Sequence, residues 1–394
     1  MKIGIITLSK GENYGGSLQN YAVMKVYENL GHEALTIFDS TRQGIRVEKE
    51  KESTLAKLRP SYIKAVFKVR TGTKYHIKNQ RDRLIPSIIR AKKNAHVISA
   101  AKKGRTASFS HFWENYIKHT DFSIDINNIP KKEIEDFDFF SVGSDQVWNP
   151  TYPSTSGIKF LNFVPKSKKL TFSPSFGLGE LPEYVKESYS KWLQDFNLIS
   201  VREERGAELI HSLCQKDAEV ICDPTITLPL EYWKEIEAKP EFETDKPYIL
   251  TYFLGNETNA YRRYIEKIAK EKDCRIINLL DLREPQYYSA GPREFLYLVH
   301  HAEAVFTDSF HAAVFSILYK RDFVVFDRVE WGSSMGSRLK TLLSVFSLEH
   351  RTYENMKVSA FSPVDFSHTE AVIEREQKKA VDFIKRSIET NLQS

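Results

Sequence analysis

The first forty residues constrain the fold most, because they alternate between the pattern of a buried strand and the pattern of a helix. Residues 2–8 form a nearly continuous apolar run, and a glycine-rich loop follows at 11–16. From Ser17 the apolar side chains recur at helical spacing until Gly31, and a second apolar run follows at 34–38. This strand–helix–strand order is typical of a parallel sheet that is covered by helices.

The same alternation resumes beyond residue 136. Short apolar runs predict strands at 137–142, 169–172, 198–201, 218–221, 248–254, 275–279, 304–307 and 323–326. Helical spacing predicts helices at 183–196, 260–272, 293–300 and from Phe310 onward. Residues 229–247 are rich in charge and proline and are expected to form a linker. We therefore expect an α/β fold of two domains, 1–228 and 245–370, with the active site in the cleft between them and an amphipathic helix at 371–394.

Composition excludes several other classes of protein. The chain has 394 residues, of which 41% are hydrophobic and 12% aromatic, so it has enough apolar material for a large core. No run of 18 apolar residues occurs, and a membrane-spanning helix is therefore not expected. The first eight residues run directly into the glycine-rich loop without a small-residue cleavage site, which indicates a buried strand and not a signal peptide.

The cysteines and histidines give no support for a disulfide scaffold or a metal site. The three cysteines at 214, 222 and 274 include no C-x-x-C pair, and we expect a cytosolic protein. His300 and His301 are adjacent, and neighbouring residues on a helix do not face each other. No H-x-x-x-H motif or Cys/His cluster occurs, so the sequence predicts a site without a metal ion and without a cofactor.

The positive charge of the chain is concentrated in one segment. Residues 41–120 contain 20 Lys and Arg against 5 Asp and Glu, whereas the whole chain has a net charge of only +5. Within this segment, 61–70 and 84–101 mix basic and apolar side chains at roughly helical spacing. We expect a basic helical insertion at about 43–120 that faces an anionic partner.

Two loops that follow predicted strands carry groups suited to ligand binding, because ligands bind at the carboxyl ends of strands in open α/β sheets. Gly15 and Gly16 would let backbone amides approach an anion at a helix start, but a tight turn explains them equally well. The loop matches neither G-x-G-x-x-G nor G-K-[ST]. In the second loop, Ser144 can bring the backbone close to a ligand and Asp145 can accept a proton or a hydrogen bond from a sugar hydroxyl; an Asx-turn is the alternative.

Two further junctions carry basic side chains. Arg202 and Arg205 end a predicted strand, and their guanidinium groups could bind carboxylate or phosphate; a surface salt-bridge cluster is the alternative. His311 lies in the first turn of a helix that Asp308 or Ser309 caps, and it lies off the apolar stripe of that helix. A histidine at the carboxyl edge of a strand is suited to general acid–base catalysis, although a structural role is the alternative.

Six short motifs occur in a characteristic order. They are N-Y-G-G-S-L-Q-N-Y-A from Asn13, F-D-F-F-S-V-G-S-D-Q-V-W from Phe137, S-V-R-E-E-R from Ser200, C-D-P-T from Cys222, T-D-S-F-H-A from Thr307, and Gly336-Ser337-Arg338. In this order and spacing they resemble the polysaccharide pyruvyl transferase family, from about residue 3 to 350. The resemblance implies a GT-B-like fold: two Rossmann-like domains, a central cleft, and a C-terminal helix that returns to the first domain.

The resemblance also implies a reaction and a set of site residues. Members of the family transfer the pyruvyl group of phosphoenolpyruvate to two hydroxyls of one sugar, which gives a cyclic ketal and releases phosphate. His311 matches the family's acid–base histidine, and Arg202 matches its donor-binding arginine. The other residues assigned to donor binding are Arg205, Ser309, Arg338, Gly15, Gly16 and Ser17, and those assigned to acceptor binding are Asn13, Tyr14, Ser144 and Asp145.

One position departs from the family pattern. Many members read Arg-Leu-His where this chain reads Ser309-Phe310-His311, and that arginine helps to hold the donor. Ser309 can give one hydrogen bond but carries no charge. Either Arg205 or Arg338 therefore substitutes for the missing cation, or this chain uses the donor differently.

The resemblance also predicts a function for the basic segment. Bacterial capsule and O-antigen repeat units are built on polyprenyl diphosphate at the anionic cytoplasmic leaflet, so we expect a lipid-linked acceptor and peripheral attachment to the inner face of the plasma membrane through residues 43–106. A solvated basic face or a homodimer contact is the alternative. Sedimentation with liposomes tests this expectation, because attachment must require anionic lipid.

Two other functions compete with pyruvyl transfer. A metal-independent nucleotide-sugar glycosyltransferase would use the same architecture, and Glu294 keeps that alternative open although no clear ribose-binding acid is present. A nucleic-acid-binding protein would use the basic segment and its aromatic side chains, but the segment contains no recognised binding module, and we expect no nucleic-acid partner.

Overall fold

The computed structural model describes residues 1–8, 11–42, 44, 95–282, 284–328 and 336–394. The helix predicted at 61–70 and most of the one predicted at 84–101 lie outside these residues. Within the described part of the chain, no helix is both long and apolar enough to cross a lipid bilayer.

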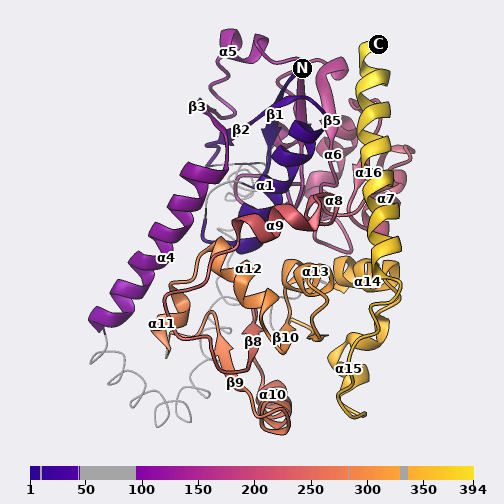
Figure 1. Cartoon of the computed structure of the whole chain (residues 1–394). Helices are drawn as coiled ribbons and strands as arrows, with labels where there is room; N and C mark the ends of the chain where they lie inside the picture. The colour runs from indigo at the N-terminus through magenta and orange to yellow at the C-terminus, as the bar shows by residue number, and fades with distance from the viewer. Residues whose placement is uncertain (9–10, 43, 45–94, 283, 329–335) are drawn as a thin grey trace, which may run out of the picture.

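The first domain is built on a five-stranded parallel sheet in the order β3-β2-β1-β4-β5 (Figure 1). Its strands are β1 (Lys2–Ile6), β2 (Glu33–Asp39), β3 (His119–Ile124), β4 (Phe139–Val142) and β5 (Lys169–Thr171). The side chains of the central strands β1 and β4 are almost entirely buried, because helices cover both faces of the sheet. Strand β3 begins where the insertion predicted at about 43–120 ends. It is an edge strand with polar, partly exposed side chains, so its sequence carries a weak strand signal.

Helices and a small sheet complete this domain. The helices are α1 (Tyr14–Asn29), α4 (Ala95–Tyr116), α5 (Lys131–Glu135), α6 (Glu183–Gln194), α7 (Glu204–Cys214), α8 (Pro224–Thr227) and α9 (Leu230–Ile236), with short 3₁₀ turns η2 (Gly157–Phe160) and η3 (Lys166–Lys168). Strands β6 (Ser200–Val201) and β7 (Glu219–Val220) form a separate parallel pair. Helix α9 occupies the start of the predicted linker, where Trp233 is buried and donates to the carbonyl of Thr225. The charge-rich composition of 229–247 therefore does not mark an unstructured connection.

The second domain has a four-stranded parallel sheet in the order β11-β10-β8-β9. Its strands are β8 (Tyr248–Tyr252), β9 (Arg275–Asn278), β10 (Ala304–Thr307) and β11 (Phe323–Val325). Its helices are α10 (Asn259–Glu271), α11 (Pro285–Tyr288), α12 (Pro292–His300), α13 (Phe310–Leu318), α14 (Gly336–Val345) and α15 (Tyr353–Met356), with the 3₁₀ turn η4 (Glu349–Arg351). Each sheet has helices on its faces, which confirms the predicted α/β fold of two Rossmann-like domains.

Helix α1 joins the two domains. It is buried along most of its length and contacts both α8 of its own domain and α12 and α13 of the second domain. The ring of Tyr14 stacks on Phe295 at 4.5 Å, and its hydroxyl donates to the carbonyl of Ala290 at 2.8 Å. The N-terminal end of α1 is therefore held at the junction of the domains.

The last helix, α16 (Thr369–Leu392), follows the second domain in the sequence but packs against β5, η3 and α8 of the first (Figure 1). The side-chain amide of Asn391 donates to the carbonyl of Lys169 at 2.9 Å, and Arg386 forms an ion pair with Glu219 at 2.8 Å. This return of the chain to the first domain is part of the GT-B-like architecture that the family resemblance implies.

Candidate active site

Arg202 lies at the centre of a buried cluster of charged side chains. It follows β6, and one of its terminal nitrogens, Nη2, lies 2.7 Å from Oδ2 of Asp223 and 2.7 Å from Oγ of Ser144. The other terminal nitrogen, Nη1, lies 3.4 Å from Oδ1 of Asp145. Only 3% of Arg202 is exposed to solvent, so these contacts are formed in a protein interior where charge interactions are strong.

The second domain brings another arginine to the same carboxylate. Arg338 lies on α14, and its Nη1 is 3.4 Å from Oδ1 of Asp145. Both guanidinium groups lie over the ring of Phe310, with their central carbons 4.9 Å (Arg202) and 5.8 Å (Arg338) from the ring centre. Arg338 is itself buried, so the two arginines and the phenylalanine form one compact group at the domain junction.

His311 completes this charged cluster from the first turn of α13. Ser309 is the N-cap of this helix, and its hydroxyl accepts from the backbone N–H of Ala312. The His311 Nε2 lies 3.6 Å from Oδ2 of Asp223 and has no hydrogen-bond partner among the described residues. A Cβ atom at Gly15 would lie only 2.0 Å from the His311 ring, so a glycine is required there. The need to leave space for the His311 ring therefore explains the glycine at position 15 without any contact with an anion.

The carboxylates of the cluster are held in their charged forms. Burial alone would raise the pKa of Asp223, but Arg202 and His311 outweigh burial and hold it well below its usual range. The same opposition, with Arg202, His311 and Arg338 against burial, lowers the pKa of Asp145. Burial raises the pKa of the neighbouring Glu203, despite the opposing influence of the two arginines. The two guanidinium charges are therefore balanced by the carboxylates of Asp145 and Asp223.

The backbone of the β4 loop is shaped to present Ser144 and Asp145. The Ser144 N–H donates to Oε1 of Gln19 on α1, and its hydroxyl donates to the carbonyl of Ser173. Asp145 has a positive φ of 63°, a conformation that aspartate tolerates better than most residues. Both residues therefore contact Arg202 within the charged cluster.

Two residues that the sequence assigned to the site lie elsewhere. The side chain of Arg205 points to other partners: its Nε donates to the carbonyl of Gly179, and its Nη1 pairs with Glu208 at 2.7 Å. Tyr14 is fully buried and bonds Ala290 and Arg105, and this packing between the domains leaves its side chain no surface for an acceptor. A βα turn and a run of charged residues do not reveal by pattern alone which way each side chain points.

Asp223 and Phe310 are the main members of the cluster to which the sequence assigned no role. Asp223 is the N-cap of α8, and its Oδ1 accepts from the backbone N–H (3.0 Å) and the hydroxyl (2.7 Å) of Thr225. An aspartate directly before Pro224 is a typical helix-start signal. This signal explains the hydrogen bonds of Oδ1 but does not predict that Oδ2 binds Arg202. Phe310 has the apolar character of the α13 core, so its contact with two cations has no sequence signal.

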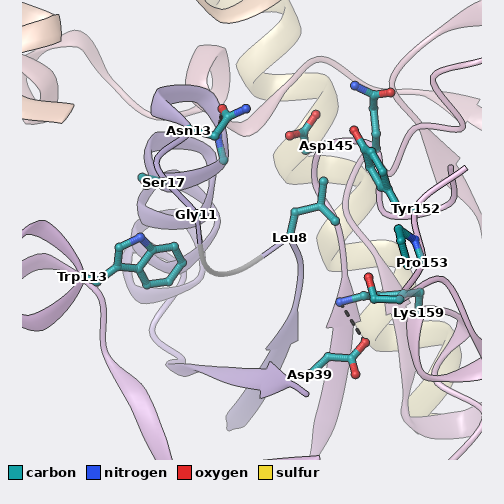
Figure 2. Close-up of a pocket in the computed structure, with 13 residues that line it drawn as sticks. Leu8, Gly11, Asn13, Ser17, Asp39, Trp113, Asp145, Tyr152, Pro153 and Lys159 are labelled. Atoms are coloured by element: carbon teal, nitrogen blue, oxygen red, sulfur yellow. Dashed lines mark hydrogen bonds and ion pairs between the residues drawn. The ribbon is translucent and has the colours of Figure 1, made fainter. Parts of the chain in front are cut away.

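A pocket of about 330 Å³ opens beside Asp145 (Figure 2). Its walls come from the loop after β1, the N-terminal end of α1, the end of β2, α4, the loop after β4, and η2. Lining residues include Asn13, Gly16, Ser17, Asp39, Trp113, Asp145, Gln146, Tyr152 and Lys159. The Ser17 hydroxyl is buried without a hydrogen-bond partner among the described residues. Lys159 forms a buried ion pair with Asp39 at 3.1 Å and donates to the carbonyl of Thr7.

A search of curated protein sequences found no match. Among solved structures, the chain resembles the UDP-GlcNAc 2-epimerase from Methanocaldococcus jannaschii (11% identity, TM-score 0.42, 95% of this chain and 99% of that one). It also resembles the UDP-GlcNAc 2-epimerase from Neisseria meningitidis bound to UDP-GlcNAc (10% identity, TM-score 0.41, 99% and 94%).

The family comparison covers most of the chain and all of the cluster's residues except Arg338. The model of one family, described as polysaccharide pyruvyl transferase, matches residues 13–328. This range begins at the N-cap of α1 and includes Asp145, Arg202, Asp223 and His311. The chain belongs to the polysaccharide pyruvyl transferase family.

Proposed function

We propose that the chain is a ketal pyruvyl transferase, which moves the pyruvyl group of phosphoenolpyruvate onto two hydroxyls of one sugar in a bacterial surface polysaccharide. The main support for this proposal is the convergence of Arg202, Arg338 and His311 beside a pocket that is lined with polar groups. The donor has a phosphate and a carboxylate, which are the groups that guanidinium side chains bind best.

The reaction needs one group that can both give and accept a proton. A proton is added to the methylene carbon of the donor, one sugar hydroxyl forms a bond to C2, the C2–O bond to phosphate breaks, and the second hydroxyl closes the ring. The two hydroxyl protons balance this sequence: one replaces the proton given to the methylene carbon, and the other leaves with phosphate. His311 is suited to this transfer because its Nε2 faces Asp223 and is otherwise uncommitted among the described residues.

The position of Arg338 supports its assignment as the second donor-binding cation. Ser309 replaces the arginine found in many family members, and its hydroxyl serves as the cap of α13. Arg338 approaches the same ring and the same carboxylate as Arg202 although it comes from a different helix. We infer that Arg338 supplies the charge that Ser309 lacks.

Donor binding must disturb the charge balance of the cluster. Because Asp145 and Asp223 already neutralise the two arginines, an anionic donor has to compete with one carboxylate. Asp145 is the weaker partner, since both of its arginine contacts are 3.4 Å long whereas Asp223 lies 2.7 Å from Arg202. We therefore expect the donor to take the place of Asp145 on the guanidinium groups and leave Asp145 to face the acceptor.

The pocket in Figure 2 is proposed to hold the acceptor sugar. Burial and Asp145 raise the pKa of Tyr152 to about 12, so its hydroxyl stays protonated and can donate. Trp113 offers an aromatic side chain at the opposite wall, and Asp39 and Lys159 add charged groups. A polyhydroxylated ligand suits such a mixture of aromatic rings and polar groups.

The family resemblance assigned Ser17 to donor binding, but Ser17 lines the pocket that is proposed here for the acceptor, so Ser17→Ala tests this pocket. An uncharged hydrogen bond contributes about 0.5–1.5 kcal/mol, so we expect KM for the acceptor to rise by about 2- to 12-fold. The stability of the protein should not fall, because the hydroxyl has no hydrogen-bond partner among the described residues. The matched control is Ser190→Ala on α6, whose hydroxyl binds the carbonyl of Leu213 outside the pocket. An unchanged acceptor KM would exclude Ser17 from the acceptor site.

Thermal unfolding with phosphoenolpyruvate tests the proposed donor without knowledge of the acceptor. A ligand at about 100 times its Kd stabilises the folded state by about 2.7 kcal/mol, which gives a measurable rise in Tm. We expect this rise with phosphoenolpyruvate and not with UDP-, GDP- or CMP-sugars. Stabilisation by a nucleotide sugar alone would indicate a glycosyltransferase and contradict the proposal.

A further inference from the structure

Two histidines and a glutamate converge at the surface where α9 of the first domain meets α12 of the second, away from the charged cluster. His300 is the last residue of α12, His301 is the C-cap of that helix, and Glu237 is the C-cap of α9. One potential ligand atom from each residue lies within 4.8 Å of the others. As neighbours within a regular helix, His300 and His301 would face apart, but α12 ends at His300 and His301 is already its C-cap.

Each of the three side chains is held in place by other contacts. The His300 Nδ1 lies 2.9 Å and 3.0 Å from the two oxygens of Glu237, and the His300 ring stacks on Tyr319. The His301 ring stacks on Tyr297, and its Nδ1 lies 2.9 Å from the Tyr297 carbonyl. The two imidazole rings are 4.6 Å apart. The rings are therefore oriented before any ligand binds.

These contacts leave nitrogen lone pairs for a ligand. A carbonyl can only accept, so the proton of His301 is on Nδ1 and its Nε2 has a free lone pair. A carboxylate against a histidine ring nitrogen is a recurrent arrangement in metal sites, where it either binds the ion or orients the ring. A tetrahedral zinc ion binds nitrogen and oxygen ligands at about 2.0–2.2 Å, so its ligand atoms lie about 3.3 Å from one another. Small rotations of the Glu237, His300 and His301 side chains would bring their ligand atoms to this spacing.

We propose that Glu237, His300 and His301 form a binding site for a zinc-type transition-metal ion. Two imidazole nitrogens and one carboxylate are typical ligands of zinc, whereas magnesium and calcium prefer oxygen ligands alone. The ion would join the ends of α9 and α12 and, through the stack of His300 on Tyr319, the C-terminal end of α13. Since His311 lies at the other end of α13, the role of the ion is to stabilise the contact between the domains and not to take part in the reaction.

Zinc titration of the full-length, EDTA-treated and desalted protein tests this site. We expect one Zn²⁺ per chain, a rise in Tm with ZnCl₂ but not with MgCl₂, and visible absorption when CoCl₂ is added. His301→Gln and Glu237→Gln should each weaken Zn²⁺ binding by more than about tenfold, because loss of a ligand costs at least as much as loss of its supporting contact. His301 is exposed, so its variant should fold normally.

The matched control is His211→Gln, which removes an exposed histidine that lies 3.3 Å from Asp217 and forms no three-ligand group with other residues in the part of the chain that the structure describes. This variant should bind Zn²⁺ like the unaltered protein. The proposal is overturned if the unaltered protein binds no Zn²⁺, or if the three variants bind it equally well. Thermal unfolding of each metal-free variant separates loss of binding from loss of folding.

Discussion

Arg202→Lys is expected to weaken phosphoenolpyruvate binding by about 10- to 100-fold while the protein remains folded. A hydrogen bond to a charged group contributes about 1.5–3 kcal/mol, and lysine keeps the charge but loses the forked guanidinium that reaches Asp223, Ser144 and the donor at once. Arg202→Ala removes the charge as well and should also destabilise the fold by about 3–5 kcal/mol, because Asp223 is left buried without its main cation. The Tm of each variant without a ligand reports its stability, and the rise in Tm with phosphoenolpyruvate reports donor binding.

Arg205→Ala is the matched control for this prediction. Arg205 is the same residue type three positions along the chain, but it binds Gly179 and Glu208 at the surface. Its replacement should leave phosphoenolpyruvate binding unchanged and cost little stability, as is usual for exposed ion pairs. If Arg205→Ala loses donor binding and Arg202→Lys does not, the cluster described here does not bind the donor.

Much of the fold could be predicted because the strands of a doubly covered parallel sheet have continuous apolar sequences. Strands β1, β4, β8 and β10 lie where the apolar runs place them, since both of their faces are buried. The edge strand β3 and helix α9 were not predicted. Their sequences are mixed or charged, and only tertiary contacts, such as the burial of Trp233, determine their structure.

The residues of the candidate site could be predicted only in part. The segments that follow β4, β6 and β10 carry Ser144, Asp145, Arg202 and His311. Parallel sheets bring the segments after their strands to one edge, which here is the domain junction. Asp223 and Phe310 could not be assigned, because each also satisfies an ordinary structural pattern as a helix cap or a core residue. Much of the basic segment at 43–106, through which membrane attachment is predicted, lies outside the described residues, so that expectation stays a prediction.

His311→Gln is expected to reduce kcat by about 10²- to 10⁴-fold, the usual contribution of a general acid–base group. Glutamine can fill the space beside Gly15 and can donate a hydrogen bond to Asp223, but it cannot exchange a proton at neutral pH. Donor binding should persist, because the two arginines are unchanged. The measurement is phosphate release from phosphoenolpyruvate with a reactive acceptor sugar, together with the Tm rise caused by phosphoenolpyruvate alone.

The combination of these two readouts separates catalysis from structure. A catalytic His311 predicts a large fall in kcat with the donor-induced Tm rise retained, whereas a structural His311 predicts that stability and donor binding fall together. His350→Gln is the control, because it removes an exposed histidine in the turn η4 and should leave both readouts unchanged. Retention of full kcat by His311→Gln would assign the proton transfer to another group, and Asp145, which lines the pocket and contacts both arginines, is the next group to test.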